Sequence, residues 1–368
     1  MSDVTLVIMT GIHPEGSDAE RMVAHARRAI TQDIVERAQQ VAGIAGIVLS
    51  TNDRSLADWG NALGVSVELD PKDIPFHFGQ HLRGLLAKLR SERVLYMGGG
   101  SAALLSTAEI GQIVDRLRAS DRVCIPNNLY STDWVGFVPA EAVEKIDPPA
   151  IDNDLGWLLA HQAGLPVETL PRQASTQFDV DTPTDLMVLS YHPGRGRHVD
   201  ALLDGLKLNT SHIERILPLL TDRSAELVVA GRVSSSVWQY MERETSCRVR
   251  MLAEERGMRA SGRLARGQVR SLLGYYYESV GAEQCFRTLA ELGQGVILDS
   301  RVLFAHLHTW PPAKDRYNSD LLRPEEIVDK AVLALTRAAM AAPVPVILGG
   351  HSLVSGGLYA LVEAARSR

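Results

Sequence analysis

Cysteine is scarce in this sequence. Only Cys124, Cys247 and Cys285 occur in a chain of 368 residues, and they stand far apart. An odd number at wide spacing argues against a disulfide framework, and none of the three lies in a spacing typical of a zinc site. This usage is typical of a reducing compartment, so we expect a cytoplasmic location.

Long apolar runs are also lacking, since none approaches the roughly 20 residues that a membrane-spanning helix needs. The apolar run inside MSDVTLVIMTGIHPEG is short and follows no basic residue, so it predicts a buried strand rather than a signal peptide. The chain has only a small excess of acidic residues, because 38 Lys and Arg face 44 Asp and Glu, which gives a formal net charge of −6. Neither nucleic acid nor a membrane is therefore expected as a partner.

The chain is long enough to fill more than one hydrophobic core, and 45% of its residues are hydrophobic. Two domains are the default at this length. We expect a first domain over residues 1–192, a linker and helical connection over 193–224, and a second domain over 225–368. The sequence is compatible with a homo-oligomer but does not determine the oligomeric state.

Strand-like and helix-like segments alternate in the first half. Strands are predicted at 4–9, 44–50, 65–69, 93–97, 122–126, 167–170 and 177–180, and helices at 18–42, 54–63, 77–90, 107–119 and 153–163. Residues 133–139 are predicted to form an inserted or antiparallel strand. This alternation predicts an α/β fold in which helices cover both faces of a mainly parallel sheet.

A second α/β unit is predicted after HPGRGRHVD (192–200), a segment rich in Gly, Pro and charge. Its strands are predicted at 226–230, 248–252, 295–299 and 344–348. Its helices are predicted at 237–244, 268–280, 283–292, 324–341 and 357–365, after two helices at 199–208 and 212–220.

The stretch QFDVDTPTDL (177–186) contains a candidate metal pair. Thr182 and Pro183 have the order of a helix start, with Asp185 in the first turn. Asp179 has no capping role. On a strand, Asp179 and Asp181 would point to the same side and reach one ion at the carboxyl edge of the sheet. Capping and loop structure is the alternative. Asp152 and Asp154, which open the helix at 153–163, are expected to cap it.

Three stretches together resemble the GT-A type nucleotidyltransferases, which include cytidylyl- and guanylyltransferases of cofactor biosynthesis. They are RVLYMGGGSAALLSTAEI (93–110), IDNDLGWLLAHQAGLPVETLP (151–171) and FDVDTPTDL (178–186), and they cover roughly the first half of the chain. The resemblance implies a three-layer fold of GT-A type, an NTP substrate, Mg²⁺, and a phosphorylated acceptor. It also implies that Asp179 and Asp181 are catalytic metal ligands.

The sequence departs from this family at the loop after the first strand. The family has a Gly-rich loop there that ends in a basic residue, whereas this chain reads MTGIHPEGSDAERM (9–22). Gly11 and Arg21 are the candidate nucleotide contacts that remain. His13, Pro14 and Glu15 are poor contacts for a phosphate, because a carboxylate repels it.

A second departure lies in MGGGSAALLS (97–106), where the family's metal-binding aspartate is absent. Gly99, Gly100 and Ser101 stand in its neighbourhood. Their backbone N–H groups could wrap a phosphate. The glycines could equally serve a tight turn, and both interpretations stay open.

Two strand–loop–helix junctions in the second half are candidate anion sites, because the N-terminus of a helix carries unpaired N–H donors. The first, LVVAGRVSSSVW (227–238), offers Arg232, Ser234 and Ser235. The second, VILGGHSLVSGGLYAL (346–361), offers Gly350, His351 and Ser352.

Arginine is dense between these junctions. Arg248 and Arg250 alternate on a predicted strand, and Arg256 follows in a loop. Arg301 and His306 lie in a long segment (298–322) rich in charge. Guanidinium groups favour phosphate and carboxylate, and we count all five among the candidate substrate contacts. A solvated basic loop, and histidines that hydrogen-bond within the protein, are the alternatives.

Three functions are compatible with these patterns. The first is an Mg²⁺-dependent nucleotidyltransferase that joins a nucleoside monophosphate to a phosphorylated or acidic small molecule. The second is a catalytically degenerate protein that binds a nucleotide or sugar phosphate. The third is an enzyme whose active site lies wholly in the second domain. A fold alone does not decide among them.

Overall fold

The structure is a computed structural model and describes residues 3–12, 15–70, 75–89 and 91–368. Two units are distinguished by their internal contacts. The first is made by the described residues within 1–13, 24–179 and 196–202, and the second by those within 14–23, 180–195 and 203–368. One of the crossings between the units lies between Asp179 and Val180, inside the stretch FDVDTPTDL, whereas the sequence places the end of the first domain at residue 192.

The first unit contains a six-stranded sheet in the order β3-β2-β1-β4-β6-β5. Its strands are β1 (Val4–Thr10), β2 (Ile44–Thr51), β3 (Ser66–Leu69), β4 (Arg93–Gly98), β5 (Val123–Pro126) and β6 (Trp134–Val138). β6 runs antiparallel to β4 and β5, and the other neighbours are parallel. The prediction of a mainly parallel sheet with one antiparallel strand is confirmed.

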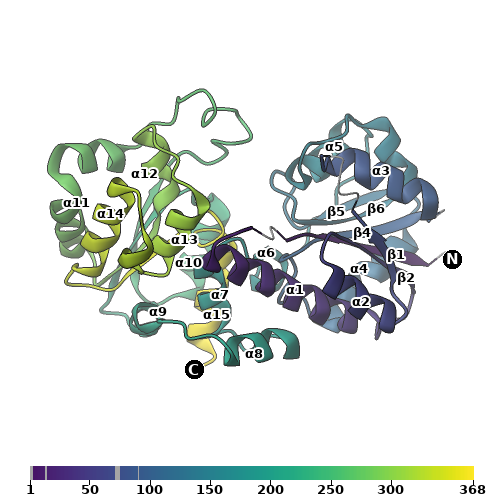
Figure 1. The fold of residues 1–368 in the computed structure, drawn as a ribbon, viewed down its shortest axis with the longest axis horizontal. Helices are drawn as coiled ribbons and strands as arrows, with labels where there is room; N and C mark the ends of the chain where they lie inside the picture. The colour runs from purple at the N-terminus through teal and green to yellow at the C-terminus, as the bar shows by residue number, and fades with distance from the viewer. Residues whose placement is uncertain (1–2, 13–14, 71–74, 90) are drawn as a thin grey trace. The chain divides into compact units, whose positions relative to one another are not determined.

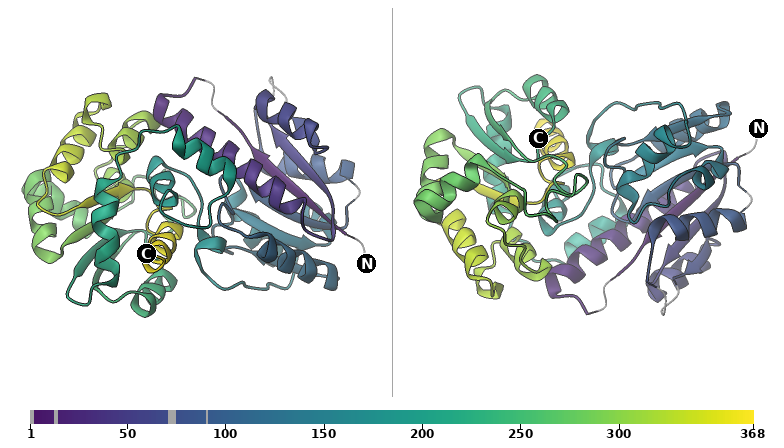
Figure 2. Two further views of the ribbon diagram at one scale, coloured as in Figure 1. Left: turned by 90° about the horizontal axis from the view of Figure 1, so that it is seen from below. Right: turned by 90° about the horizontal axis from the view of Figure 1, so that it is seen from above.

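Helices cover both faces of this sheet (Figures 1 and 2). On one face Val7, Val94 and Tyr96 pack against α3 (Phe78–Leu89) and α5 (Leu155–His161) in a continuous apolar cluster. The other face is covered by α1 (Asp18–Ala38), α2 (Arg54–Ala62) and α4 (Thr107–Ala119). Because strand side chains alternate between the two faces, these strands read as nearly continuous apolar runs in the sequence.

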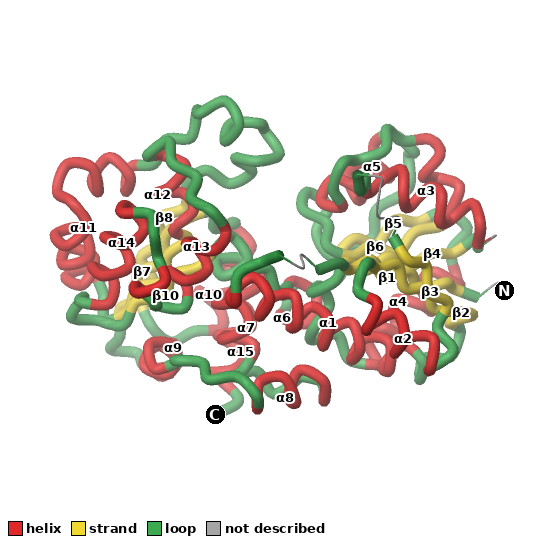
Figure 3. The backbone as a smooth tube through the Cα atoms, in the orientation of Figure 1, coloured by secondary structure: helices red, strands yellow, loops and turns green. Residues whose placement is uncertain are grey.

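The second unit contains a four-stranded, fully parallel sheet in the order β10-β9-β7-β8. Its strands are β7 (Glu226–Gly231), β8 (Arg248–Ala253), β9 (Gly295–Asp299) and β10 (Val346–Gly349). α11 (Leu272–Leu292) and α14 (Lys330–Met340) pack on one face. The strands lie between these helices and α10 (Ser235–Glu244) and α15 (Gly356–Arg366), as Figure 3 shows.

The strand order reverses beside β7. From β7 the chain passes to β8 on one side, and then to β9 and β10 on the other. Such a reversal opens a crevice beyond the carboxyl ends of the two strands at which it occurs, here β7 and β9. The fold alone therefore marks the residues after Gly231 and Asp299 as a place where a ligand can enter.

The predicted helix start at Thr182 is confirmed by α7 (Pro183–Leu189), which belongs to the second unit. Asp185 is buried, and its Oδ2 accepts hydrogen bonds from the backbone N–H of Thr182 at 2.7 Å and from Ser352 Oγ at 2.6 Å. Thr184 Oγ1 donates to the carbonyl of Leu348 at 2.6 Å. These bonds attach α7 to the end of β10.

Two predicted strands of the first half are wrong. Residues 167–170 form only one bridge, between Val167 and Cys124, and the flanking Pro166 and Pro171 have no N–H to extend a ladder. Residues 177–180 are also not a strand. Gln177 closes a single helical turn, α6 (Ala174–Gln177), and only Asp179 makes a bridge, to Ser101.

The segment 298–322 contains helices that the sequence analysis did not predict. They are α12 (Ser300–His306) and α13 (Ala313–Asp320). α12 begins directly after β9, because Asp299 Oδ1 accepts the N–H of Arg301 at 3.2 Å and so caps the helix. His306 is therefore the last residue of a helix.

Asp185 provides a test of this packing. Burial raises the pKa of its carboxyl group to about 7, and its Oδ1 has no hydrogen-bond partner among the described residues. The folded protein therefore keeps this proton up to about pH 7, whereas the unfolded chain loses it near pH 4. The contribution of this group to stability is complete below pH 4 and is lost as the pH rises towards 7.

We predict that Asp185→Asn flattens the fall of the free energy of unfolding between pH 5 and pH 7, measured by urea denaturation. The difference from the unmodified protein is at most about 1.4 kcal/mol per pH unit. The control is Asp204→Asn, because Asp204 is an exposed residue of α8 (Arg197–Asp204). An unchanged pH dependence in Asp185→Asn would contradict the assignment.

Candidate functional site

The GGGS segment after β4 makes a tight turn whose N–H groups are largely occupied. The N–H of Gly98 donates to Asp133 O at 2.9 Å, that of Gly99 to Met9 O at 2.8 Å, and that of Ser101 to Gly98 O at 3.2 Å. Gly100 has a φ of 99°. A Cβ on Gly99 would lie 2.0 Å from Thr10 Oγ1. These glycines therefore serve close approach and turning, and Gly99 and Ser101 have no free N–H with which to wrap a phosphate.

Carboxylates from three loops lie at the carboxyl edge of the six-stranded sheet. Asp152 Oδ2 accepts the hydroxyl hydrogen of Tyr96 at 3.0 Å. Asp133, just before β6, accepts from Asn127 Nδ2 at 2.8 Å. Asp179 forms its bridge with Ser101 at the same edge. Because β4 ends where the antiparallel β6 begins, these loops meet at one end of the sheet.

Asp152 is oriented toward the end of β4. A Cβ built on Gly98 would lie 3.0 Å from Asp152 Oδ2, so the carboxylate stands beside the position from which a side chain at residue 98 would project. Burial, together with the charges of Asp152 and Asp133, raises the pKa of Tyr96 well above its usual value. The phenol therefore stays protonated and donates to Asp152.

The expected capping role of Asp152 is wrong. Asp152 and Asp154 form a short 3₁₀ turn before α5, and no side-chain hydrogen bond caps the start of α5. Local sequence patterns do not single out Asp152 as a metal ligand. Its place inside the stretch IDNDLGW, which carries part of the family resemblance, was the signal that could have identified it.

Asp179 and Asp181 fall in different units. Asp179 is the last residue of its segment in the first unit. In the second unit, the N–H of Asp181 donates to Asp185 Oδ2 at 3.1 Å. The predicted strand that would place both carboxylates on one side is absent. A metal ion bound by both Asp179 and Asp181 stays a prediction.

Gly11 and Arg21 also belong to different units. The loop at Gly11 is held by Asn52, which exchanges two hydrogen bonds of 2.8 and 2.9 Å with the backbone of Ile12. Arg21 is half-exposed and pairs with Asp18 and with the carbonyl of Gly16. His13 and Pro14 lie outside the described residues.

In the second unit, Arg232 and Asp299 meet at the carboxyl ends of β7 and β9. Arg232 donates from Nε and Nη2 to the two carboxylate oxygens of Asp299, at 2.6 and 3.0 Å. Both side chains are buried. Gly231 has a φ of +129°, and a Cβ there would lie 2.3 Å from Asp299 Cβ. Only glycine permits this close approach of the two strand ends.

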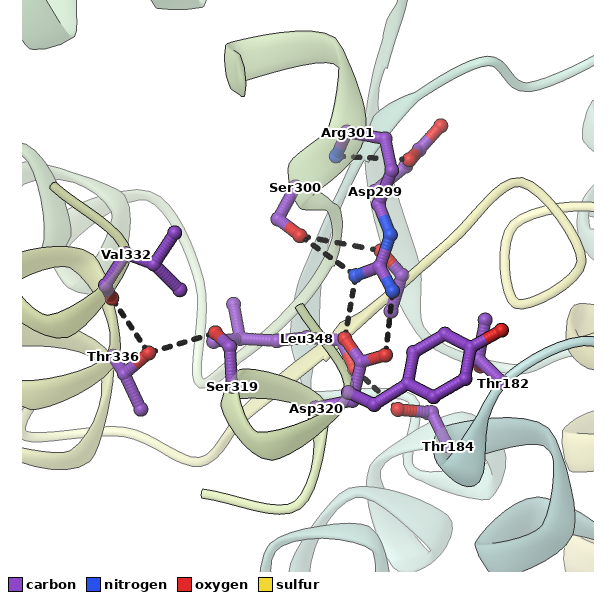
Figure 4. A network of polar contacts seen from close by, with 12 residues as sticks. Thr182, Thr184, Asp299, Ser300, Arg301, Ser319, Asp320, Val332, Thr336 and Leu348 are labelled. Carbon is purple, nitrogen blue, oxygen red and sulfur yellow. Dashed lines mark hydrogen bonds and ion pairs between the residues drawn. The ribbon is translucent and has the colours of Figure 1, made fainter. Parts of the chain in front are cut away.

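A second buried pair lies beside the first. Arg301 donates to both oxygens of Asp320 at 2.5 and 2.6 Å, and to Ser300 Oγ at 3.0 Å (Figure 4). Burial alone would lower the pKa of Arg301, but the Asp320 carboxylate outweighs it and the pKa is raised. The arginine is therefore held charged and fixed in orientation.

His351 lies at the same edge, after β10. Burial, followed by the charge of Arg232, lowers the pKa of its imidazole to about 4. His351 is therefore neutral near pH 7 and offers one N–H donor and one acceptor nitrogen. The exposed Arg256 and the carboxylates of Asp181 and Asp299 also act on its titration. The structure thus brings Arg232, Arg256, Arg301 and His351 of the predicted anion contacts into one region.

Other predicted contacts have local structural roles. Ser234 caps α10 by accepting the N–H of Val237 at 3.2 Å, and Ser235 is the first residue of that helix. Ser352 is bonded to Asp185. A Cβ on Gly350 would lie 3.2 Å from Thr182 Cγ2, so the lack of a side chain at Gly350 allows the start of α7 to pack closely against it.

Arg248 and Arg250 are not part of the carboxyl-edge region. Both pair with Glu226, at 3.6 and 3.3 Å, where β7 and β8 begin. His306 is buried, accepts the N–H of Ser271 at Nδ1 (3.0 Å), and has its Nε2 3.2 Å from Glu278. It hydrogen-bonds within the protein, as the alternative interpretation held.

One group of three potential metal ligands occurs in the part of the chain that the structure describes, namely Asp33, Glu36 and His198. The Asp33 oxygens accept the N–H groups of His198 and Val199 at 2.9 and 3.1 Å. Glu36 pairs with Arg197 and with His198 Nε2. These bonds cap the start of α8, so the group has a structural explanation.

Comparison with known proteins finds similarity over about half of the chain. No protein-family model matches, and no curated protein matches. A protein described as a nucleotide-diphospho-sugar transferase from Desulfovibrio desulfuricans aligns at 18% identity over 56% of this chain and 95% of its own, with a TM-score of 0.42.

Two other solved structures carry ligands in their descriptions. A CMP:2-keto-3-deoxy-manno-octonic acid synthetase complexed with CTP aligns at 14% identity over 56% of this chain and all of its own (100%), with a TM-score of 0.36. The manganese complex of Rv0371C from Mycobacterium tuberculosis aligns at 20% identity over 50% of this chain and 95% of its own, with a TM-score of 0.33.

None of the helices formed by the described residues has the length and apolar character required to cross a membrane.

The Arg301–Asp320 pair yields a prediction. Arg301→Gln should lower the free energy of unfolding by about 3–5 kcal/mol, because it leaves the buried Asp320 carboxylate without its partner. Urea denaturation followed by circular dichroism measures this loss. Arg287→Gln is the matched control, since Arg287 is exposed on α11 and makes only a 4.0 Å pair with Glu283. A loss in Arg301→Gln no larger than in the control would show that the pair is not structural.

Proposed function

We propose that the first unit binds an NTP together with Mg²⁺ at the carboxyl edge of its six-stranded sheet. We further propose that it transfers the nucleoside monophosphate to a phosphorylated or acidic small molecule. The observation that carries this proposal is the position of the Asp152 carboxylate beside Gly98, at the end of β4. The carboxylate of Asp152, which comes from another loop, thus lies at the end of β4, where β4 itself has no acidic side chain.

The residues present fit a hard divalent cation. Mg²⁺ in nucleotide sites takes one or two carboxylates and completes its shell with phosphate oxygens and water. Asp152 and Asp179 offer carboxylates from two loops at this edge. When bound, the ion would draw the triphosphate to this edge and offset charge that develops at the α-phosphate.

The chain's own residues would position the reaction partners. Tyr96 donates to Asp152 and fixes its orientation. Asn127 binds the Asp133 carboxylate, and its Oδ1 accepts the N–H of Asp133 at 2.9 Å. This mutual bonding holds the loop before β6 in place. A nucleotide base or sugar would meet these polar side chains at the same sheet edge.

A catalytically degenerate binding protein is the second candidate, and one observation favours it. The N–H groups of Gly98, Gly99 and Ser101 are already donated within the protein, so these three groups do not contribute backbone contacts to a phosphate. Under this alternative the nucleotide still binds, but no pyrophosphate is released.

We predict that an NTP raises the melting temperature of the protein only when Mg²⁺ is present, and that Asp152→Asn weakens this NTP binding at least tenfold, or by about 1.4 kcal/mol. Thermal shift with each of the four NTPs, followed by calorimetric titration of the best one, gives the measurement. Asp179→Asn should weaken binding by a similar factor.

Asp115→Asn is the matched control, because Asp115 is exposed on α4 away from the sheet edge. Equal affinity in Asp152→Asn and Asp115→Asn would refute the metal assignment. Pyrophosphate release with a mixture of phosphorylated acceptors then separates the transferase from the binding protein.

A further inference from the structure

Four arginines gather at the carboxyl edge of the four-stranded sheet in the second unit. They are Arg232, Arg259, Arg301 and Arg316, and we call them the arginine cluster. The charges of Arg232 and Arg301 both act on the titration of Arg259, and the charges of Arg301 and Arg259 act on that of Arg316. The cluster lies where the strand order reverses between β7 and β9, the position at which open α/β sheets bind ligands.

Two members of the cluster are already neutralised. Arg232 is paired in a bidentate manner with Asp299, and Arg301 with Asp320. All four of these side chains are buried. The two buried ion pairs hold Arg232 and Arg301 in fixed orientations. They supply N–H groups to the site but add little net charge.

Arg259 and Arg316 differ from the other two. Neither makes an ion pair or a side-chain hydrogen bond with any residue that the structure describes. Both instead lie against one aromatic ring, with guanidinium carbons 5.3 Å and 4.8 Å from the centroid of Trp310. The Nε of Arg316 is buried without a hydrogen-bond partner among the described residues.

The nearby carboxylates offset these two charges only in part. Asp181 attracts Arg259, and Asp320 attracts Arg316, but Asp320 already binds Arg301 through both of its oxygens. Burial, followed by the neighbouring arginines, lowers the pKa of both Arg259 and Arg316. Arginine charges that lie near one another without ion pairs repel each other, and an anion bound by both guanidinium groups would remove that repulsion.

We propose that the arginine cluster is a binding site for the phosphate group of a small phosphorylated molecule, with Arg259 and Arg316 as its principal contacts. A phosphate monoester carries close to two negative charges near pH 7, which matches the two guanidinium groups that lack ion pairs. Planar guanidinium groups bind its oxygens through paired hydrogen bonds. The neutral His351 lies close to Arg232 and Arg256 and adds a donor that does not change with pH above its pKa of about 4.

Trp310 offers a contact surface for the organic part of the phosphorylated ligand. Its side chain is 37% exposed although it contacts two cations. A half-exposed indole beside an anion site offers an apolar surface for the organic part of a phosphorylated molecule. The proposal rests on contacts inside the second unit and does not depend on the function proposed for the first.

The test uses the full-length protein with inorganic phosphate as the probe, at constant ionic strength set with chloride. Calorimetric titration and intrinsic tryptophan fluorescence should both report saturable binding. Arg259→Gln and Arg316→Gln should each weaken phosphate binding about 10- to 100-fold, which is the effect of losing one charge-assisted contact. Trp310→Phe should bind phosphate but lose the fluorescence change.

Arg287→Gln is the control, because it removes one arginine of the same unit from an exposed helix face. Melting curves of each variant establish that it is folded before binding is compared. Phosphate binding that is absent in the unmodified protein, or that is equal in Arg316→Gln and Arg287→Gln, would overturn the proposal. Tighter binding of succinate than of phosphate would overturn the assignment to a phosphate group.

Discussion

The second unit depends on the contact between Arg232 and Asp299. It joins the ends of β7 and β9 at the point where the strand order reverses, and it needs the bare backbone of Gly231 to form. The same aspartate caps α12 and so directs Arg301 toward Asp320. The Asp299 carboxylate thus sets the position of Arg232 and Arg301. Arg259, Arg316 and Trp310 lie around these two fixed arginines.

Each unit places polar groups at the carboxyl edge of its sheet, but the two sets of groups have opposite charge. The first edge gathers carboxylates, Asp133, Asp152 and Asp179, around a glycine turn whose N–H groups are used internally. The second edge gathers guanidinium groups that outnumber their carboxylate partners. The first arrangement is the basis of the proposed cation site, and the second is the basis of the proposed phosphate site.

Local patterns in the sequence predicted most of the fold. β9 and α4 agree in full with prediction, because each is a strongly apolar or periodic run with clear ends. α12 was missed because Asp299 is both the last strand residue and the helix cap, so no loop separates the two. The orientation of Asp152 toward Gly98, and the shared contact of Arg259 and Arg316 with Trp310, join residues far apart in the chain. No local periodicity encodes such pairings.

The cap at the start of α8 has a consequence for any survey of metal content. Asp33, Glu36 and His198 have the chemistry of a divalent-ion site, yet the oxygens of Asp33 are already committed to two main-chain amides. An ion that entered there would lie next to the Arg197 guanidinium, which pairs with Glu36 and whose positive charge opposes the binding of a cation. Cation binding at this place would therefore be weakened by a fixed positive charge, which distinguishes it from the carboxylates at the edge of the six-stranded sheet.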